Sequence, residues 1–291
     1  MRSVLERRLA LFVDRDSEMQ RFRDLLKPNG KPIMIVSGDS GLGKSSLLAR
    51  MVHECASSKI YKAEVLWTDT RNHDYLALMR KVRDDLGVEH FHKFTDLVNF
   101  FTVPHYHLTV DSSIRVGDSL VNRGHIGEVA GILIKDCMLN IPRDDMAVPE
   151  NERMIRLTDR FFDELEALSR NNQVVVFLDA VEKMTADTER WICDEFVRRI
   201  HEGELNNVKL LAFGQRKPKL PSSRQFIEEA QLQPISEQHI VEYMAKRGVP
   251  EEVRGVAAGI ILVASHGNPC EMANLVEAVM ARLGSLMPPN E

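Results

Sequence analysis

The feature that most restricts the fold of this chain is a short apolar run followed at once by a glycine-rich segment. Residues 33–37 read Ile-Met-Ile-Val-Ser, a pattern typical of a strand buried on both faces of a sheet. The next residues are Gly38, Asp39, Ser40, Gly41, Leu42, Gly43, Lys44, Ser45 and Ser46. A helical pattern begins at Lys44, so the chain contains a strand, a glycine-rich turn and a helix in direct succession.

The glycine-rich turn has the Gly-x4-Gly-Lys-Ser spacing of a phosphate-binding P-loop. Its glycines let backbone N–H groups approach phosphate oxygens, and the start of the new helix favours the same anion. The Lys44 ammonium would neutralise charge on the β- and γ-phosphates, and the Ser45 hydroxyl would complete the Mg²⁺ shell. We therefore expect residues 38–46 to bind a nucleoside triphosphate together with Mg²⁺.

A second candidate group lies at the end of another apolar run. Val174 to Leu178 is the most apolar strand pattern in the chain, and it leads directly into Asp179. Phosphoryl transfer needs an acid that holds the metal and a residue that orients the attacking water. Asp179 is expected to hold Mg²⁺ and Glu182 to orient water, although Asp179 could instead cap a helix and Glu182 could be a solvated helix residue.

Strand patterns alternate with helical patterns through the first 233 residues, which predicts a mainly parallel sheet covered by helices. The α/β domain would have five strands. They are expected at 33–37, 64–68, 174–178, 208–213 and 229–232, with helices at 17–27, 44–55, 75–86 and 152–169. Residues 88–150 form an insertion or long helical connection, with a helix expected over 119–139. Only helices are expected after Ser236, at 237–247, 251–265 and 268–283, so residues 234–291 would be a small all-helical lid domain.

Composition excludes several classes of protein. The net charge of −5 argues against a dedicated nucleic-acid surface, so nucleic acid is a possible but not a favoured partner. The N-terminus has no apolar core of a secretory signal, and the longest apolar stretch, 256–264, is too short to cross a membrane. Four cysteines without a Cys-x-x-Cys pair indicate free thiols in a reducing compartment. We expect a cytoplasmic protein with no membrane partner.

Four segments together resemble the STAND NTPases, the signal-transducing relatives of AAA+ ATPases that include the NACHT and apoptotic-ATPase groups. The segment 177–182, Phe-Leu-Asp-Ala-Val-Glu, is similar to the end of their Walker B strand. The segment 12–18 resembles their N-terminal Phe-x-Gly-Arg-x-x-Glu motif, with Asp14 where glycine is usual. The segment 211–218 resembles their sensor strand, and 266–269, His-Gly-Asn-Pro, matches the Gly-x-Pro motif of their helical lid.

The resemblance implies roles for three further residues. Arg15 would approach the nucleotide, Arg216 would act as a catalytic sensor near the γ-phosphate, and Pro269 would pack near the adenine or hold the lid. Each has a simpler interpretation, because the two arginines could be surface charges and a proline is favoured at a helix start. Arg198 and Arg199 could be an arginine finger, but cations that stabilise a helix end are the preferred interpretation.

The resemblance also implies a function, namely an ATPase, possibly a slow one, that works as a nucleotide-controlled switch. ATP and ADP with Mg²⁺ would control the assembly of a signalling or defence complex, by self-association or with protein partners that supply effector and sensor functions. The alternative is an AAA+-type motor or loader acting on nucleic acid or protein. Ala180 follows Asp179 where AAA+ motors carry glutamate, which favours the switch. Only Pro269 points to adenine, and no Asn-Lys-x-Asp guanine-reading motif is present.

Overall fold

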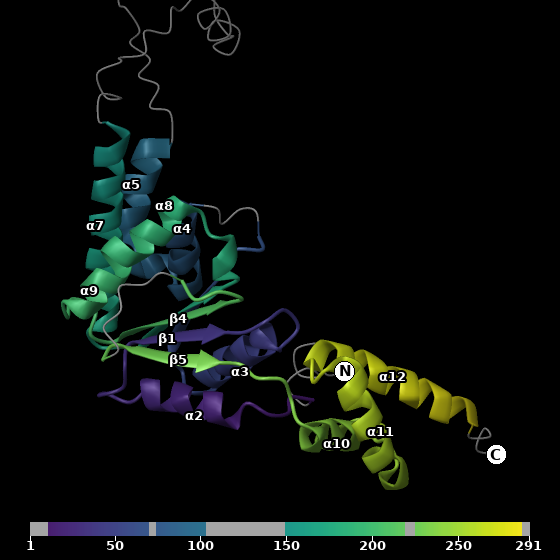
Figure 1. Cartoon of the computed structure of the whole chain (residues 1–291). Coiled ribbons are helices and arrows are strands. Elements are labelled where there is room, and N and C mark those ends of the chain that lie inside the picture. Colours follow the sequence, from purple (N-terminus) through teal and green to yellow (C-terminus); the bar gives the residue numbers. More distant parts are fainter. Residues whose placement is uncertain (1–10, 70–73, 103–148, 219–224, 287–291) are drawn as a thin grey trace, which may run out of the picture. The chain divides into compact units, whose positions relative to one another are not determined.

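The computed structural model describes residues 11–69, 74–102, 149–218 and 225–286 (Figure 1). The helix predicted over 119–139 lies outside these residues. The chain divides into two compact units, residues 1–92 with 161–291, and residues 93–160. The second unit includes most of helix α5 (His92–Thr102) and the first half of α7 (Glu150–Ser169). The first unit contains the sheet and every candidate site residue.

The sheet has five strands in the order β2-β3-β4-β1-β5, and every neighbouring pair is parallel. The strands are β1 (Ile33–Ser37), β2 (Tyr61–Leu66), β3 (Val174–Asp179), β4 (Val208–Gly214) and β5 (Ile227–Gln231). Every residue of β1, β3 and β4 is buried, which accounts for their nearly continuous apolar sequences. The predicted five-stranded α/β fold is confirmed.

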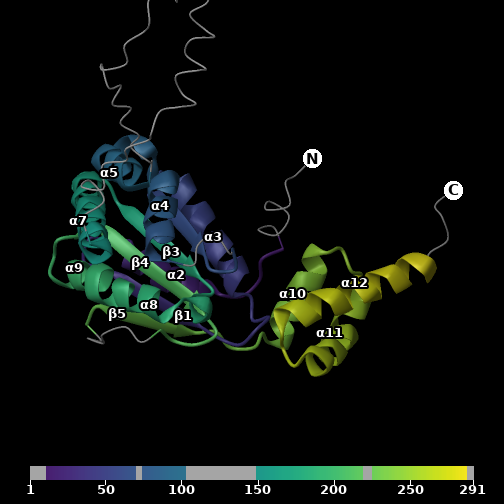
Figure 2. The ribbon, with the colours of Figure 1, turned by 90° about the horizontal axis from the view of Figure 1, so that it is seen from above.

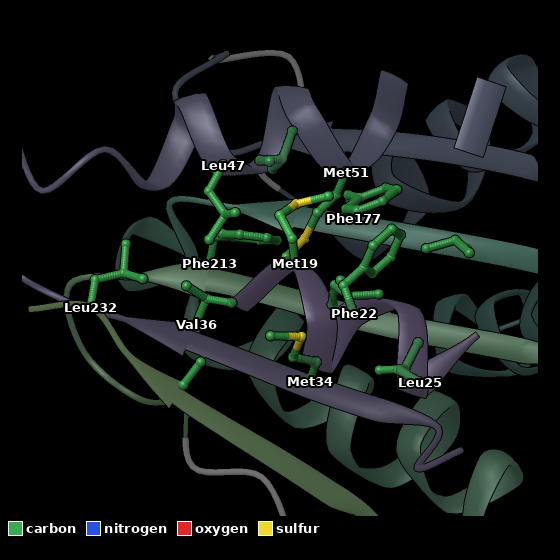
Figure 3. Packing of buried hydrophobic residues seen from close by; sticks show 14 of the residues in the cluster. Met19, Phe22, Leu25, Met34, Val36, Leu47, Met51, Phe177, Phe213 and Leu232 are labelled. Atoms are coloured by element: carbon green, nitrogen blue, oxygen red, sulfur yellow. The ribbon is translucent and has the colours of Figure 1, made fainter. Parts of the chain in front are cut away.

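One face of the sheet is covered by α2 (Asp16–Leu25) and α3 (Lys44–Ser57). Their apolar side chains recur at helical spacing and meet those of the central strands (Figure 3). The core on this face includes Met19, Phe22, Leu47, Met51, Met34, Val36, Phe177 and Phe213. The ring centroids of Phe22 and Phe177 lie 6.2 Å apart, so α2 packs directly on β3.

The opposite side of the sheet from α2 carries α8 (Ala186–Trp191) and α9 (Arg198–His201), which are joined by a π-helical turn (Ile192–Val197) (Figure 1). Phe162 of α7 stacks on Trp191 at 5.5 Å and meets Phe196 edge-on at 5.3 Å. Helix α4 (Tyr75–Leu86) packs against β2. Short 3-10 turns lie at Val88–His90 and Val181–Lys183.

Strand β2 begins three residues earlier than the sequence predicted, and it ends two residues earlier. Tyr61 pairs with Val174, and its N–H donates to the Gln173 carbonyl. Trp67 and Thr68 leave the strand because a turn begins there, closed by the Asp69 N–H on the Leu66 carbonyl at 3.2 Å. The prediction began at Glu64, whereas pairing with β3 also includes Tyr61, Lys62 and Ala63.

Side chains bind three of the outward backbone groups of the two edge strands. On β5, the carbonyls of Ile227 and Glu229 accept from Lys31 Nζ at 3.1 Å and Arg21 Nη1 at 2.7 Å. On β2, the Glu64 N–H donates to an Asp85 carboxylate oxygen at 2.8 Å. Unpaired edge groups are templates for added strands, and these contacts occupy three such groups.

After β5 the chain forms a helical segment, defined here as α10 (Glu237–Lys246), α11 (Glu251–Ser265) and α12 (Pro269–Leu286) (Figure 2). It has its own apolar core, centred on Ile240, Met244, Ile261 and Val276. The predicted helices are confirmed, with α12 continuing to Leu286. Among the described residues, no helix is both long enough and apolar enough to cross a bilayer.

The segment Leu11–Val13 joins the two apolar cores. Leu11 and Val13 pack against the core of the helical segment, whereas Phe12 between them packs against the core beneath the sheet. Alternate side chains of an extended chain point in opposite directions, so three residues can serve both cores. This segment therefore fastens the helical segment to the α/β domain.

Two adjacent isoleucines of α11 give a matched test of the helical core. Ile261 is 3% exposed and Ile260 is 67% exposed. We expect Ile261→Ala to lower the free energy of unfolding by about 2–5 kcal/mol, because it leaves a cavity. Ile260→Ala should change it by less than about 0.5 kcal/mol. Urea unfolding followed by circular dichroism measures both, and equal effects would contradict the packing of α11.

Candidate functional site

The P-loop, Gly38 to Ser45, connects the buried end of β1 to the first turn of α3. Gly41 and Gly43 have φ values of +83° and +85°, a conformation that favours glycine. The Gly38 N–H donates to the Gly214 carbonyl at the end of β4 at 3.3 Å, which ties the loop to the neighbouring strand. The loop therefore stands at the carboxyl edge of the sheet, where ligands of open α/β sheets bind.

Because all strands run parallel, the ends of β1 and β3 meet at this same edge. The Ser45 hydroxyl donates to Asp179 Oδ2 at 3.2 Å, and Asp179 Oδ1 accepts from the Ala180 N–H at 2.9 Å. Burial raises the pKa of Asp179 above its ordinary value, and these two hydrogen bonds oppose that shift. Two groups that are far apart in sequence thus form one contact beside the P-loop.

The Lys44 ammonium lies inside the loop that it would serve. Its Nζ donates to the carbonyls of Gly38 at 2.6 Å and Asp39 at 2.7 Å. Burial lowers the pKa of Lys44, and the nearby carboxylates of Glu182 and Asp179 act in the opposite direction. An anion in the loop would offer this ammonium stronger, charge-assisted partners than two neutral carbonyls.

Glu182 is brought back to the site by a left-handed residue. Ala180 has a φ of +59°, and the chain reverses there into the turn that carries Glu182. Glu182 Oε2 accepts from the Gln215 N–H at 3.0 Å, just beyond the end of β4. A polar cavity of about 330 Å³ is lined by Lys44, Ser45, Asp179, Glu182, Thr68 and Gln215, among others.

A second cavity, of about 480 Å³, lies on the other side of Gly41, Gly43 and Ser46, which line both. Its remaining lining is mostly apolar. It includes residues of the segment 11–13, of the chain before α10 and of the helical segment, namely Leu11, Phe12, Val13, Ile235, Tyr243, Pro269, Met272 and Ala273. We call this the apolar cavity. The two cavities together could hold a polyanion beside an apolar ring system.

Arg15 lies at the apolar cavity but is bound to the protein backbone. Its Nη2 donates to the Leu42 carbonyl at 3.1 Å and to the Gln233 carbonyl at 2.8 Å, and its Nη1 pairs with Asp14 at 3.1 Å. The side chain is only 7% exposed. Arg15 therefore connects the P-loop to the chain that leads into the helical segment, and a direct approach to the nucleotide stays a prediction.

The remaining candidate residues, Pro269, Arg216, Arg198 and Arg199, differ in whether they lie at a cavity. Pro269 lines the apolar cavity, whereas Arg216 is exposed and lines neither cavity. Arg198 pairs with Glu195 and Glu202, and Arg199 pairs with Glu195 and Glu204. These contacts agree with the interpretation of Arg198 and Arg199 as cations at a helix end.

Four residues near the P-loop were given no role by the sequence analysis. Thr68, Gln215 and Cys270 line the polar cavity, and Asn268 donates to the Ser40 carbonyl. Thr68 and Gln215 follow the ends of β2 and β4, so strand ends neighbouring Asp179 were the available signal. Asn268 precedes a proline that opens a helix, which is the signature of an N-cap. Nothing in the sequence indicated Cys270.

The donor set fits Mg²⁺ only together with a phosphate ligand. Within the described residues, no group of three or more histidine, cysteine or acidic side chains is arranged to hold a metal. The Ser45 hydroxyl and the Asp179 carboxylate are hard oxygen donors that already touch each other. Mg²⁺ keeps waters and binds through one or two protein oxygens plus substrate phosphates, which is what this pair can supply.

Residues 11–200 match the AAA ATPase domain family. The chain belongs to this family. The match includes the P-loop, Asp179 and Glu182, and it ends before β4 and the helical segment. A comparison with curated proteins found no match.

Three solved structures align with this chain at low sequence identity. Drosophila ORC bound to DNA aligns at 12% identity over 98% of this chain and 64% of that chain, with a TM-score of 0.51. CDC6P from Pyrobaculum aerophilum aligns at 12% over 93% and 63%, with a TM-score of 0.49. A STAND protein with a tetratricopeptide repeat sensor from Pyrococcus horikoshii aligns at 13% over 89% and 28%, with a TM-score of 0.45. The chain spans 28% to 64% of the lengths of these proteins, and the likeness bears on the fold alone.

The buried Asp179 carboxylate predicts a stability that depends on pH. Because its pKa is raised on folding, the unfolded chain releases this proton more easily, so the free energy of unfolding falls as pH rises through the interval between the two pKa values. Asp179→Asn, measured without nucleotide and with a chelator, should raise the melting temperature at neutral pH. The gain should shrink as the pH falls toward the ordinary value of 3.8.

The exposed Asp187 provides the control for this prediction, because Asp187→Asn removes the same charge from the surface. Its effect on the melting temperature should be small. A gain for Asp179→Asn that stays constant from acid to neutral pH would contradict the assigned cause.

Proposed function

We propose that this protein binds ATP with Mg²⁺, hydrolyses it slowly, and acts as a nucleotide-controlled switch. The observation that carries the proposal is the meeting of Lys44, Ser45, Asp179 and Glu182 at one polar cavity. The adjoining apolar cavity, partly lined by the helical segment, would take the nucleobase. Membership of the AAA ATPase family supports nucleotide binding and makes hydrolysis the expected activity.

In this proposal each group of the polar cavity has one task. The P-loop N–H groups and Lys44 would bind the β- and γ-phosphates, and Ser45 with Asp179 would hold Mg²⁺. Mg²⁺ would supply charge neutralisation at the phosphates. Glu182 would orient the attacking water, and the bond it accepts from the Gln215 N–H at 3.0 Å would hold its carboxylate in place.

Arg216 needs a change of side-chain direction to serve as a γ-phosphate sensor. It follows Gln215, which lines the polar cavity, but the arginine itself is exposed and does not line that cavity. We keep the sensor role of Arg216 as a proposal that depends on bound nucleotide attracting the guanidinium.

The switch would use the α/β domain, residues 1–233, and the helical segment within 234–291 as its two parts. A ligand shifts an equilibrium only by its differential affinity for two arrangements. A nucleotide that touches both the P-loop and Pro269 would have different affinities for the two arrangements, since moving the helical segment would remove contacts with the base. Partners that supply sensing or output, or further copies of the chain, would respond to that arrangement.

A motor or loader acting on nucleic acid is the competing proposal. Ala180 in place of a second acid after Asp179 and the net charge of −5 both favour the switch. Hydrolysis that is strongly stimulated by DNA, with a steep dependence on salt, would support the motor instead.

Lys44→Ala tests whether the P-loop binds the nucleotide. The variant should lose nucleotide affinity by at least about tenfold, because a charge-assisted contact to phosphate is worth about 1.5–3 kcal/mol. Calorimetric titration with ATP measures this, and the exposed Lys27→Ala is the control. Unchanged affinity in Lys44→Ala would exclude this site.

The same variant tests the switch. Mass measurement in solution should show a different assembly state with ADP than with a non-hydrolysable ATP analogue, and Lys44→Ala should show no such difference. If the wild-type protein has the same mass with both nucleotides, the proposed switch is wrong and only the proposed ATPase activity stands.

Glu182→Gln tests hydrolysis separately from binding. The amide keeps the shape of the side chain but cannot act as a base, so turnover should fall by about a hundredfold or more while ATP affinity stays within a few-fold. Phosphate release measures turnover, and Glu252→Gln on the surface of α11 is the control. If turnover is unchanged in Glu182→Gln, Glu182 does not orient the attacking water and another residue must do so.

A further inference from the structure

Asn268, between α11 and α12, makes two kinds of contact with one side-chain amide. Its Oδ1 accepts from the N–H groups of Cys270 at 2.9 Å and Glu271 at 3.3 Å, which caps the start of α12. Its Nδ2 donates to the Ser40 carbonyl of the P-loop at 3.1 Å. The cap fixes which end of the amide faces the helix, so the end that faces Ser40 must be the donor.

The P-loop is shaped to accept this approach. A Cβ atom on Gly41 would lie 2.4 Å from Asn268 Nδ2, closer than any side-chain atom could remain. Gly41 therefore serves two purposes, since its φ of +83° also favours glycine. The glycine that this left-handed backbone conformation favours also makes room for the helical segment.

The contact lies where the two cavities meet. Pro269, the residue after Asn268, lines the apolar cavity, and Cys270 lines both cavities. Met272 and Ala273 continue the wall of the apolar cavity along α12. A hydrogen bond at Asn268 thus sets the distance between the wall proposed to face the base and the loop proposed to hold the phosphates.

We propose that Asn268 is a positioning residue that holds the first turn of α12 against the P-loop and thereby strengthens binding of the nucleoside part of the nucleotide. The inference rests on the proposed nucleotide site. Asn268 needs no contact with the nucleotide, because it acts through the placement of Pro269 and the neighbouring residues of α12. The Ser40 carbonyl is the point at which a change in the P-loop would reach the helical segment.

Two substitutions separate this role from helix capping. Aspartate and serine are both good N-caps, so Asn268→Asp and Asn268→Ser keep the start of α12. Neither presents a donor to the Ser40 carbonyl: a carboxylate only accepts, and the serine side chain is too short to cap and reach Ser40 together. Asn268→Ser is also neutral, so it removes the donor without placing a negative charge near the phosphates.

The experiment compares two probes, ATP and inorganic tripolyphosphate, each with Mg²⁺. Tripolyphosphate would engage the P-loop but not the apolar cavity. We expect Asn268→Ser to weaken ATP binding by about three- to tenfold, as expected for one lost hydrogen bond, and to leave tripolyphosphate affinity within twofold. Calorimetric titration measures both, and thermal unfolding confirms that the variants fold.

The outcomes distinguish this inference from the function on which it rests. If wild-type protein binds neither probe, the nucleotide site itself is wrong. If wild-type protein binds ATP but Asn268→Ser binds it equally well, the positioning role is wrong and the site stands. Equal weakening of ATP and tripolyphosphate by Asn268→Ser would also overturn the positioning role, because the effect would then lie in the P-loop. Asn268→Asp should weaken ATP at least as much as Asn268→Ser.

Discussion

Three parallel strands buried on both faces impose the arrangement on which everything else in this molecule depends. Every residue of β1, β3 and β4 is removed from water, so these strands have no exposed face on which to place polar chemistry. Parallel direction then brings all their carboxyl ends to one edge. Asp179, the P-loop and Gln215 meet there because each lies at or just after a strand end, although they are far apart in the chain.

The second organising contact is the buried guanidinium of Arg15. It holds carbonyls of the P-loop and of the chain before α10, at Leu42 and Gln233, while Leu11 and Val13 pack into the helical core. A charged group taken out of water is stable only with such partners. The N-terminal segment is thus part of the site's framework, which explains why an arginine with no contact to the polar cavity lies beside the P-loop.

Much of this could be predicted from local pattern. The P-loop, the burial of β1 and β3 and the helical segment after Ser236 follow from motif and periodicity, which depend on near neighbours in sequence. The bounds of β2 could not, since Tyr61 and Lys62 join the strand only through pairing with β3. Arg15 shows a second limit: its motif placed it near the loop, but its carbonyl partners, one of them 218 residues away, are a property of the folded chain.

Asn268 shows the same limit more sharply. The sequence presents a residue between glycine and proline, and only the fold brings its amide to Ser40, 228 residues away. Gln215 is similar, because its backbone rather than its side chain binds Glu182, and a backbone contact leaves no trace in residue type. Sequence pointed to the groups that we propose to do chemistry, whereas the groups that hold them in place became visible with the tertiary structure.

The side chains that occupy the outer edge of β5 have a consequence for how the protein resists aggregation. Arg21 belongs to α2, and Lys31 lies in the connection from α2 to β1. Helix α2, which covers one face of the sheet, therefore also supplies a side chain that occupies a backbone carbonyl on the β5 edge. Detachment of α2 would uncover Met19, Phe22 and their partners and free the Glu229 carbonyl of β5 in the same event. Resistance to strand addition thus depends in part on the same helix as the apolar core. A partly unfolded chain that loses α2 loses part of its edge protection together with the cover of that core.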